Sequence, residues 1–216
     1  MKIAVIQGSS QKDKNQLLYT AVKDAVEKNG DEVVNFGVFP DEDITFSYIQ
    51  SSLCISLLLE SQSVDFVVTG CSSGQGMMLA CNSFPGVLCG YVESPADAYL
   101  FGRINDGNAI SYPLGLNFAW AAEINLKSVL EALFTEPFGS GYEKKDAERK
   151  RQDTKFLKKI NTLAKKSLAE ILPLLEEDFL QSVLSRHCVY EYILSHGKND
   201  VLKKELERYK KALSDK

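Results

Sequence analysis

Histidine is scarce in this sequence, and paired metal-binding cysteines are missing. There are two histidines, His187 and His196, and five cysteines, none of them in a Cys-x-x-Cys pair: Cys54, Cys71, Cys81, Cys89 and Cys188. Zinc and iron–sulfur centres take their ligands from such clusters, so the composition predicts no metal site and no resident cofactor. An odd number of cysteines also fits reduced thiols better than a disulfide framework.

Long apolar runs and a positive net charge are absent as well. No stretch has 18 consecutive apolar residues, the length that suggests a membrane-spanning helix, and the apolar run at residues 2–7 is too short for a signal peptide. We therefore expect a cytoplasmic protein with no membrane partner. The net charge of −4 argues against a nucleic-acid partner, because such proteins normally have a basic face. A local excess of lysine and arginine over residues 143–166 still allows an anion site there.

The first two thirds of the chain alternate between strand-like and helix-like patterns. Short runs rich in Ile and Val predict buried strands at residues 2–7, 32–36, 65–70, 87–91 and 109–112. Apolar residues at helical spacing predict helices at 14–29, 48–60, 77–83, 94–101 and 119–134. The alternation predicts the α/β class: a three-layer, doubly wound, Rossmann-like fold whose five-stranded parallel sheet has helices on both faces.

The composition changes near residue 138. A loop at 138–142 is followed by a strongly charged run, and residues 154–216 show helical periodicity with a break at His196-Gly197. The sequence therefore predicts an α/β domain over 1–138 and an all-α C-terminal extension over 139–216.

The glycine-rich segment 71–76, CSSGQG, follows the third predicted strand. In doubly wound sheets, ligands bind beyond the carboxyl ends of the strands. Small residues at the start of a helix let backbone N–H groups converge on an anion. The segment matches neither a dinucleotide fingerprint nor a P-loop, so a tight turn with serine caps explains it as well as a binding loop does. Cys71 favours a functional role, because a thiol near a helix N-terminus has a favoured thiolate that can act as base or nucleophile.

Two separated segments, CSSGQGMMLACNSFPGV and AYLFGRINDGNAISYPLG, resemble the family of type B ribose-5-phosphate isomerases and galactose-6-phosphate isomerases. The resemblance covers most of the chain before residue 138. It rests on eight positions: Cys71, Gly74, Gly76, Asn82, Gly86, Asn105, Asp106 and Asn108.

The resemblance implies an aldose–ketose isomerase that works through a cis-enediolate of a sugar phosphate. Cys71 would be the base, and Ser73 would hydrogen-bond the reacting oxygens. It further implies a homodimer with the active site near the subunit interface. The substrate-binding residues would be Ser9, Ser72, Gly74, Gln75, Gly76 and Asn105, with Arg149, Arg151 and Lys155 as candidates for the phosphate.

Two family positions are changed in this chain. Gly8-Ser9-Ser10 stands where the family has Asp-His after the first strand, and Ile104 stands where it has the histidine held to open the sugar ring. We therefore hypothesise a short or predominantly open-chain sugar phosphate. A four-carbon sugar 4-phosphate, for example, cannot close a furanose ring. Alternatively, Tyr48 or a residue of a partner subunit replaces the histidine, and a pentose 5-phosphate is the substrate.

Two other functions fit parts of the sequence. A non-catalytic sugar-phosphate-binding protein on the same fold would explain the lost histidines, but it would not need the thiol of Cys71. A flavodoxin-like flavin or nucleotide binder would use Gly8-Ser9-Ser10 as a phosphate loop. Outside segment 71–76, we expect Cys81 and Cys89 to pack in the core, and Trp120 to lie in the core or in a subunit contact.

Overall fold

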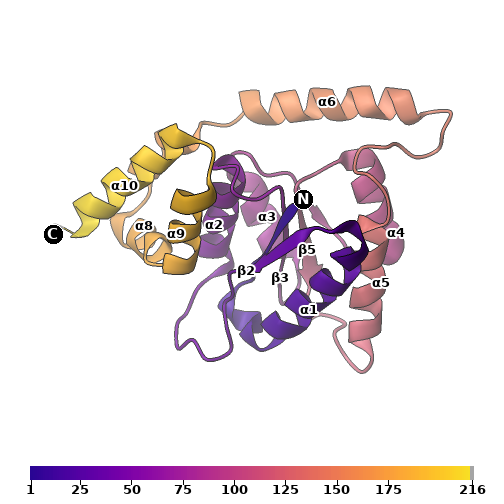
Figure 1. The fold of residues 1–216 in the computed structure, drawn as a ribbon, viewed down its shortest axis with the longest axis horizontal. Coiled ribbons are helices and arrows are strands. Elements are labelled where there is room, and N and C mark those ends of the chain that lie inside the picture. Colours follow the sequence, from indigo (N-terminus) through magenta and orange to yellow (C-terminus); the bar gives the residue numbers. More distant parts are fainter. Residues whose placement is uncertain (215–216) are drawn as a thin grey trace.

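The structure is a computed structural model and describes residues 1–214 (Figure 1). The sheet contains β1 (Lys2–Val5), β2 (Glu32–Asn35), β3 (Phe66–Cys71), β4 (Cys89–Tyr91) and β5 (Ala109–Pro113). The helices up to residue 134 are η1 (Ser9–Lys14), α1 (Asn15–Val26), η2 (Glu27–Asn29), α2 (Tyr48–Glu60), α3 (Gln75–Ser83), α4 (Pro95–Leu100), η3 (Phe101–Asn105) and α5 (Ala122–Phe134). Those that follow are α6 (Ala147–Leu163), α7 (Leu168–Ile171), η4 (Leu172–Leu174), α8 (Glu177–Leu184), α9 (His187–His196) and α10 (Asp200–Ser214).

All five strands are parallel, in the order β2-β1-β3-β5-β4. The predicted α/β class and the five-stranded parallel sheet are therefore confirmed. The central strand β3 is buried along its whole length and pairs with β1 on one side and β5 on the other. It ends at Cys71, one residue later than its pattern predicts, so the cysteine is the last residue of the strand.

The two faces of the sheet have separate hydrophobic cores, because successive side chains of a strand point to opposite faces. One core joins Ile3 and Val5 of β1 to α1 and α5. The other joins Ala4 of β1 and Val67 of β3 to α2 and α3.

The C-terminal helices continue this second core. Leu168, Leu184, Ile193 and Leu206 belong to the same hydrophobic cluster as the side chains of α2. Helix α2 is largely apolar and is buried around its whole circumference, because its residues 51–59, three serines included, are all buried. A helix of that kind must be covered on every side, and α8 and α9 cover the side of α2 that faces away from the sheet (Figure 1).

Helix α6 differs from the other helices of the extension. It lies across the end of the sheet at which β1 and β5 begin, and Ala147 is its one buried residue (Figure 1). It contacts η3, where the Thr154 hydroxyl donates to the Ile104 carbonyl at 2.7 Å. Within residues 1–214, no helix is long and apolar enough to cross a membrane.

Candidate active site

Cys71 lies at the carboxyl edge of the sheet, where the strands end and loops lead into helices. It is opposite Pro113 of β5, and its own carbonyl accepts a hydrogen bond from the Leu114 N–H at 2.9 Å. The side chain is 9% exposed, so it is nearly enclosed. Cys71 is therefore held by its pairing with β5, whereas the pairing of β3 with β1 ends at Val68.

The turn after Cys71 leads directly into α3. Gly74 has φ +74°, a left-handed conformation that glycine adopts without strain, and a Cβ there would lie 2.8 Å from the Tyr91 ring. The Gly74 carbonyl accepts a hydrogen bond from the Ser111 hydroxyl at 2.7 Å, and the Ser73 hydroxyl accepts a 3.4 Å hydrogen bond from the Gln75 N–H. Helix α3 begins at Gln75, two residues earlier than expected. The first N–H groups of a helix have no partner within it, so this turn offers N–H donors next to Cys71.

The loop between β5 and α5 is attached to this turn. The N–H groups of Gly115 and Leu116 both donate to the Ser72 carbonyl, at 2.8 and 2.7 Å. The same loop carries Trp120, which is 98% exposed. Trp120 precedes α5, and its exposure excludes a place in the core; the subunit contact, the other expectation for this residue, stays a prediction.

The segment after β1 forms the other wall of the site. Ser9 and Phe46 are joined by two hydrogen bonds: the Ser9 N–H donates to the Phe46 carbonyl at 2.9 Å, and the Ser9 hydroxyl accepts from the Phe46 N–H at 3.1 Å. The Ser9 side chain therefore holds the loop before α2. The Gln11 side chain contacts the turn after Cys71, because its amide nitrogen donates to the Ser72 hydroxyl at 2.9 Å.

Two tyrosines border the glycine-rich turn. The ring of Tyr48 lies beside Gly76, where an added Cβ would be in ordinary van der Waals contact with it. Tyr48 also lines a largely apolar cavity of about 310 Å³. Tyr91 donates a 2.9 Å hydrogen bond to Glu93, which also accepts one from Asn117 at 2.9 Å. Burial and the adjacent Glu93 carboxylate raise the pKa of Tyr91 to about 12, so this phenol stays protonated and donates to Glu93 at neutral pH.

The remaining predicted site residues lie at the opposite edge of the sheet. Asn105 precedes β5, whereas Cys71 aligns with the last residue of β5, so the length of that strand separates them within one chain. Arg149, Arg151 and Lys155 lie on α6, which covers the same edge as Asn105. Arg149 pairs with Asp153, and Arg151 with Glu148 and the Ser140 carbonyl. One chain thus brings together Ser9 and residues 71–76, but not Asn105 or the basic residues of α6.

Several residues of the two motifs have structural tasks at this opposite edge. The Asn82 side chain bonds both backbone groups of Cys89, at 2.8 and 2.9 Å. The Asn108 side chain similarly joins Leu88 to Gly86, and Asp106 pairs with Lys158 of α6. These residues hold β4 and α6 in place at the far end of the sheet from Cys71.

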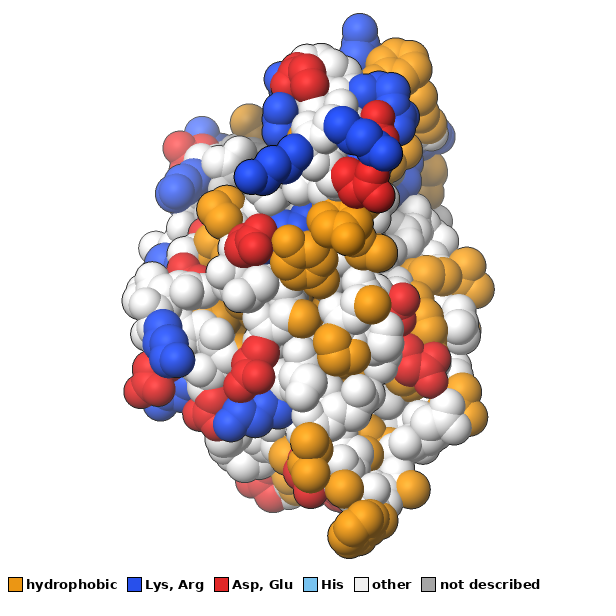
Figure 2. Space-filling model, turned by 90° about the vertical axis from the view of Figure 1, so that its right-hand side faces the viewer, with side chains coloured by type: hydrophobic (Ala, Val, Ile, Leu, Met, Phe, Trp, Pro, Cys, Tyr) orange, Lys and Arg blue, Asp and Glu red, His pale blue; other side chains and the backbone are white. Residues whose placement is uncertain are grey.

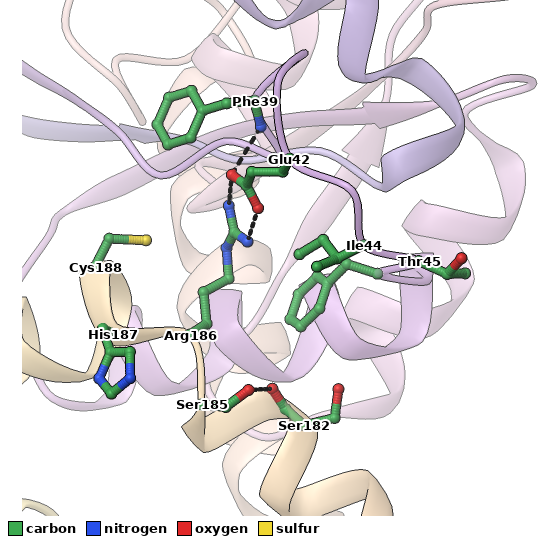
Figure 3. Close-up of a pocket in the computed structure, with 10 residues that line it drawn as sticks. Phe39, Glu42, Ile44, Thr45, Ser182, Ser185, Arg186, His187 and Cys188 are labelled. Atoms are coloured by element: carbon green, nitrogen blue, oxygen red, sulfur yellow. Dashed lines mark hydrogen bonds and ion pairs between the residues drawn. The ribbon is translucent and has the colours of Figure 1, made fainter.

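A second cavity lies between the loop before α2 and the junction of α8 and α9 (Figure 3). It measures about 400 Å³, and Arg186 points into it. The Arg186 guanidinium, whose side chain is 5% exposed, binds both carboxylate oxygens of Glu42 at 2.7 and 2.9 Å and donates to the Phe36 carbonyl. Burial raises the pKa of Glu42, but hydrogen bonds from Arg186 and Phe39 outweigh it and hold the pKa below the usual 4.5. This ion pair joins the extension to the loop that Ser9 also holds.

Among residues 1–214, no cluster of three or more potential metal-ligating side chains exists. Cys54, Cys81 and Cys89 are buried as free thiols in the core beneath α2 and α3, as expected for Cys81 and Cys89, while Cys188 is exposed. His187 and His196 lie in α9, away from residues 71–76.

Residues 9–153 match the model of the ribose/galactose isomerase family. Over its whole length the chain is similar to a 4-deoxy-L-threo-5-hexosulose-uronate ketol-isomerase solved with tartrate (38% identity, TM-score 0.91, 100% of each chain). It is also similar to a ribose-5-phosphate isomerase from Vibrio parahaemolyticus (32% identity, TM-score 0.91, 97% of this chain and 99% of that one). Type B ribose 5-phosphate isomerase from Trypanosoma cruzi shares the fold at 20% identity (TM-score 0.61, 74% of this chain and 98% of that one). A comparison with curated protein sequences gives no match.

The Glu42–Arg186 pair predicts a pH-dependent stability. Because the pKa of Glu42 is lower in the folded state, its stabilising effect is complete above pH 4.5 and is lost as the pH falls through the folded-state pKa. Replacing Glu42 with Gln leaves a buried arginine without its counter-charge and should cost about 2–5 kcal/mol at pH 7. Urea unfolding at pH 7 and at lower pH measures this, and the difference from the wild type should shrink on acidification.

The matched control for this test is Glu143→Gln. Glu143 forms an exposed ion pair with Lys145 at 3.0 Å, and such pairs contribute about 0–1 kcal/mol. Equal destabilisation by the two substitutions, or a Glu42→Gln effect that does not change with pH, would contradict the assigned role of the buried pair.

Proposed function

Because the chain belongs to the ribose/galactose isomerase family, we propose that this sugar isomerase interconverts the aldose and ketose forms of an acidic, open-chain sugar, with Cys71 as the base. One observation carries the proposal. Cys71 is the last residue of a strand buried on both faces, and a turn of small residues leads from it straight into the N-terminus of α3. A proton acceptor and a set of N–H donors for a developing oxyanion are thus side by side.

The reaction follows from this pairing. The Cys71 thiolate takes the proton from C2 of the aldose, and the electron pair moves to the C1 oxygen to give a cis-enediolate. The N–H groups of the turn 72–76 stabilise the negative charge, which is larger in this intermediate than in the substrate. The hydroxyl proton passes from O2 to O1, and the thiol returns its proton to C1. A 2-ketose results, and no atom is gained or lost.

The open-chain substrate is inferred from the missing histidine. Ile104 replaces the ring-opening histidine, and its carbonyl is engaged by α6 at the opposite edge of the sheet. A sugar that cannot close a ring needs no such acid. The similar ketol-isomerase is named for a 5-hexosulose-uronate, an acid whose C5 carries a carbonyl in place of the hydroxyl that closes a pyranose ring. We infer the same class here, a sugar acid with a free carbonyl, in preference to a cyclic pentose phosphate.

A homodimer would unite the two halves of the site. Asn105 and the α6 cations lie at the edge opposite Cys71 in one chain, so a second copy must supply them if they contact the substrate. Apolar side chains that suit such a contact are exposed on one side of α6: Phe156, Leu157, Ile160 and Leu163. Figure 2 shows hydrophobic side chains along one side of the top of the molecule, where α6 lies in Figure 1. Tyr48, Ile49 and Leu79 are exposed beside Gly76. Apolar surface of this kind is typical of subunit interfaces.

Removing the thiol tests the role of Cys71. Cys71→Ala should lower kcat by at least about 100-fold, the usual contribution of a positioned base, while the affinity for a bound sugar acid stays within about threefold. The control is Cys188→Ala, which removes the exposed thiol and should keep full activity. Steady-state rates and calorimetric titration give the two readouts. Turnover retained in Cys71→Ala would exclude the cysteine as base.

Substrate comparison tests the open-chain inference. Purified enzyme should isomerise a 4-deoxy-5-keto-hexuronate with a kcat/KM at least about tenfold above that for ribose 5-phosphate. The reason is that the enzyme has Ile104 in place of the histidine that would open the ring of ribose 5-phosphate. A tetrulose 4-phosphate, which also cannot close a furanose ring, separates the need for an open chain from the preference for a carboxylate. A clear preference for ribose 5-phosphate would overturn the inferred substrate.

Mixed dimers test the shared site. Cys71→Ala and Asn105→Ala chains, each of low activity alone, should regain about a quarter of wild-type activity when co-expressed, because half of the dimers are mixed and each mixed dimer has one intact site. The activity of the unseparated co-expressed chains measures this, and the heterodimer purified through two different tags should show about half of wild-type activity. If both residues served a site within one chain, no mixture would recover activity.

A further inference from the structure

We propose that Lys14 binds the acidic group of the substrate and that Gln11 holds its ammonium in position. This inference deepens the proposed function and rests on it. Neither side chain belongs to the motifs from which the site was predicted. Both lie in η1, the segment that follows β1 at the carboxyl edge of the sheet, the edge at which Cys71 ends β3.

Gln11 connects the lysine to the catalytic turn. Its amide nitrogen donates to the Ser72 hydroxyl at 2.9 Å, and its amide oxygen accepts from the Lys14 ammonium at 2.8 Å. Ser72 directly follows Cys71, so two hydrogen bonds join the ammonium to the neighbour of the base. This chain fixes the orientation of the Gln11 amide, because the two ends of the amide cannot exchange roles without losing the bond to lysine.

The other side of Lys14 faces Phe118. The ammonium lies 5.0 Å from the centre of that ring, a distance at which a cation is attracted to the aromatic face. Phe118 belongs to the loop whose Gly115 and Leu116 N–H groups bind the Ser72 carbonyl. Both groups that contact the ammonium thus belong to segments bonded to Ser72: Gln11 of η1, and Phe118 of the loop after β5.

The charge of Lys14 is the second part of the argument. No ion pair within residues 1–214 includes Lys14, and its recorded contacts are to an amide oxygen and an aromatic ring, both neutral. Arg149, Arg151 and Lys158 of α6 differ from it, as does Arg186 before α9, because each of these four is matched by a carboxylate. A half-buried ammonium with neutral partners retains an unmatched positive charge, here two hydrogen bonds away from Ser72.

This placement suits a sugar acid. When the carbonyl end of an open chain lies at Cys71 and its oxygens face the turn 72–76, the acidic end needs a cation on the same edge of the sheet. Lys14 supplies one from the same chain. A charge-assisted hydrogen bond to it would select acidic sugars over neutral ones.

The test is substitution of Lys14 with Met, which keeps the length of the side chain and removes its charge. KM for the acidic substrate and Kd for tartrate, a hydroxy acid used as an unreactive probe, should each rise about 10- to 100-fold, as expected for loss of a charge-assisted bond. The kcat should change much less, because the base and the oxyanion donors are untouched. Lys14→Arg should recover most of the affinity, whereas a purely structural lysine would show no such dependence on charge.

Two further variants complete the test. Lys23→Met removes the same charge from the exposed side of α1 and should leave KM and Kd unchanged. Gln11→Leu keeps the lysine but removes its support, and should give a smaller loss of affinity; it also serves if Lys14→Met does not fold. Unchanged KM and Kd in Lys14→Met would overturn the inference, as would equal losses in Lys14→Met and Lys23→Met. Retained turnover in Cys71→Ala would instead refute the proposed function, whatever Lys14 does.

Discussion

The end of β3 at Cys71 organises the whole site. The strand is buried along its whole length, and its last residue is paired with Pro113 of β5 and bonded to the Leu114 N–H, so it has little freedom to move. Three segments that border the turn 72–76 are attached to it by hydrogen bonds. Gln11 bonds the Ser72 side chain, the loop after β5 bonds the Ser72 carbonyl, and Ser111 bonds the Gly74 carbonyl. A shift of this one turn would therefore move three walls of the site together.

The local features of the fold were predictable because they depend on neighbours in the sequence. Helix α2 begins and ends where its pattern predicts, at Tyr48 and Glu60, and Ser47 caps it through a capping box with Gln50. Segment 71–76 was recognisable for the same reason, since a strand end, small residues and a helix start follow one another in the chain. The start of α3 was predicted two residues too late, because the left-handed Gly74 lets the helix begin at Gln75.

Features that depend on distant contacts were not predictable. The role of Gln11 requires its contact with Ser72, 61 residues away, and nothing in the segment GSSQKDKNQ distinguishes Gln11 or Lys14 from ordinary surface residues. The resemblance implies that Asn105 and Cys71 serve the same substrate, but the sheet puts the two at opposite edges of one chain because Asn105 precedes a strand and Cys71 ends one. The position of the basic residues of α6 was not predictable either. It depends on the contacts of Thr154 with Ile104 and of Lys158 with Asp106, which are distant in the sequence.

The cover over α2 has a consequence for how the chain folds during synthesis. Helix α2 is made early, but the side of it that faces away from the sheet is covered by residues between Leu168 and Leu206. Until those residues leave the ribosome, the nascent α/β layer exposes an apolar helix, and the buried Arg186 has not yet reached Glu42. The second core therefore cannot be completed until the residues from Leu168 to Leu206 have been synthesised. A chain whose synthesis stops before them would expose the uncovered side of α2, a surface prone to aggregation.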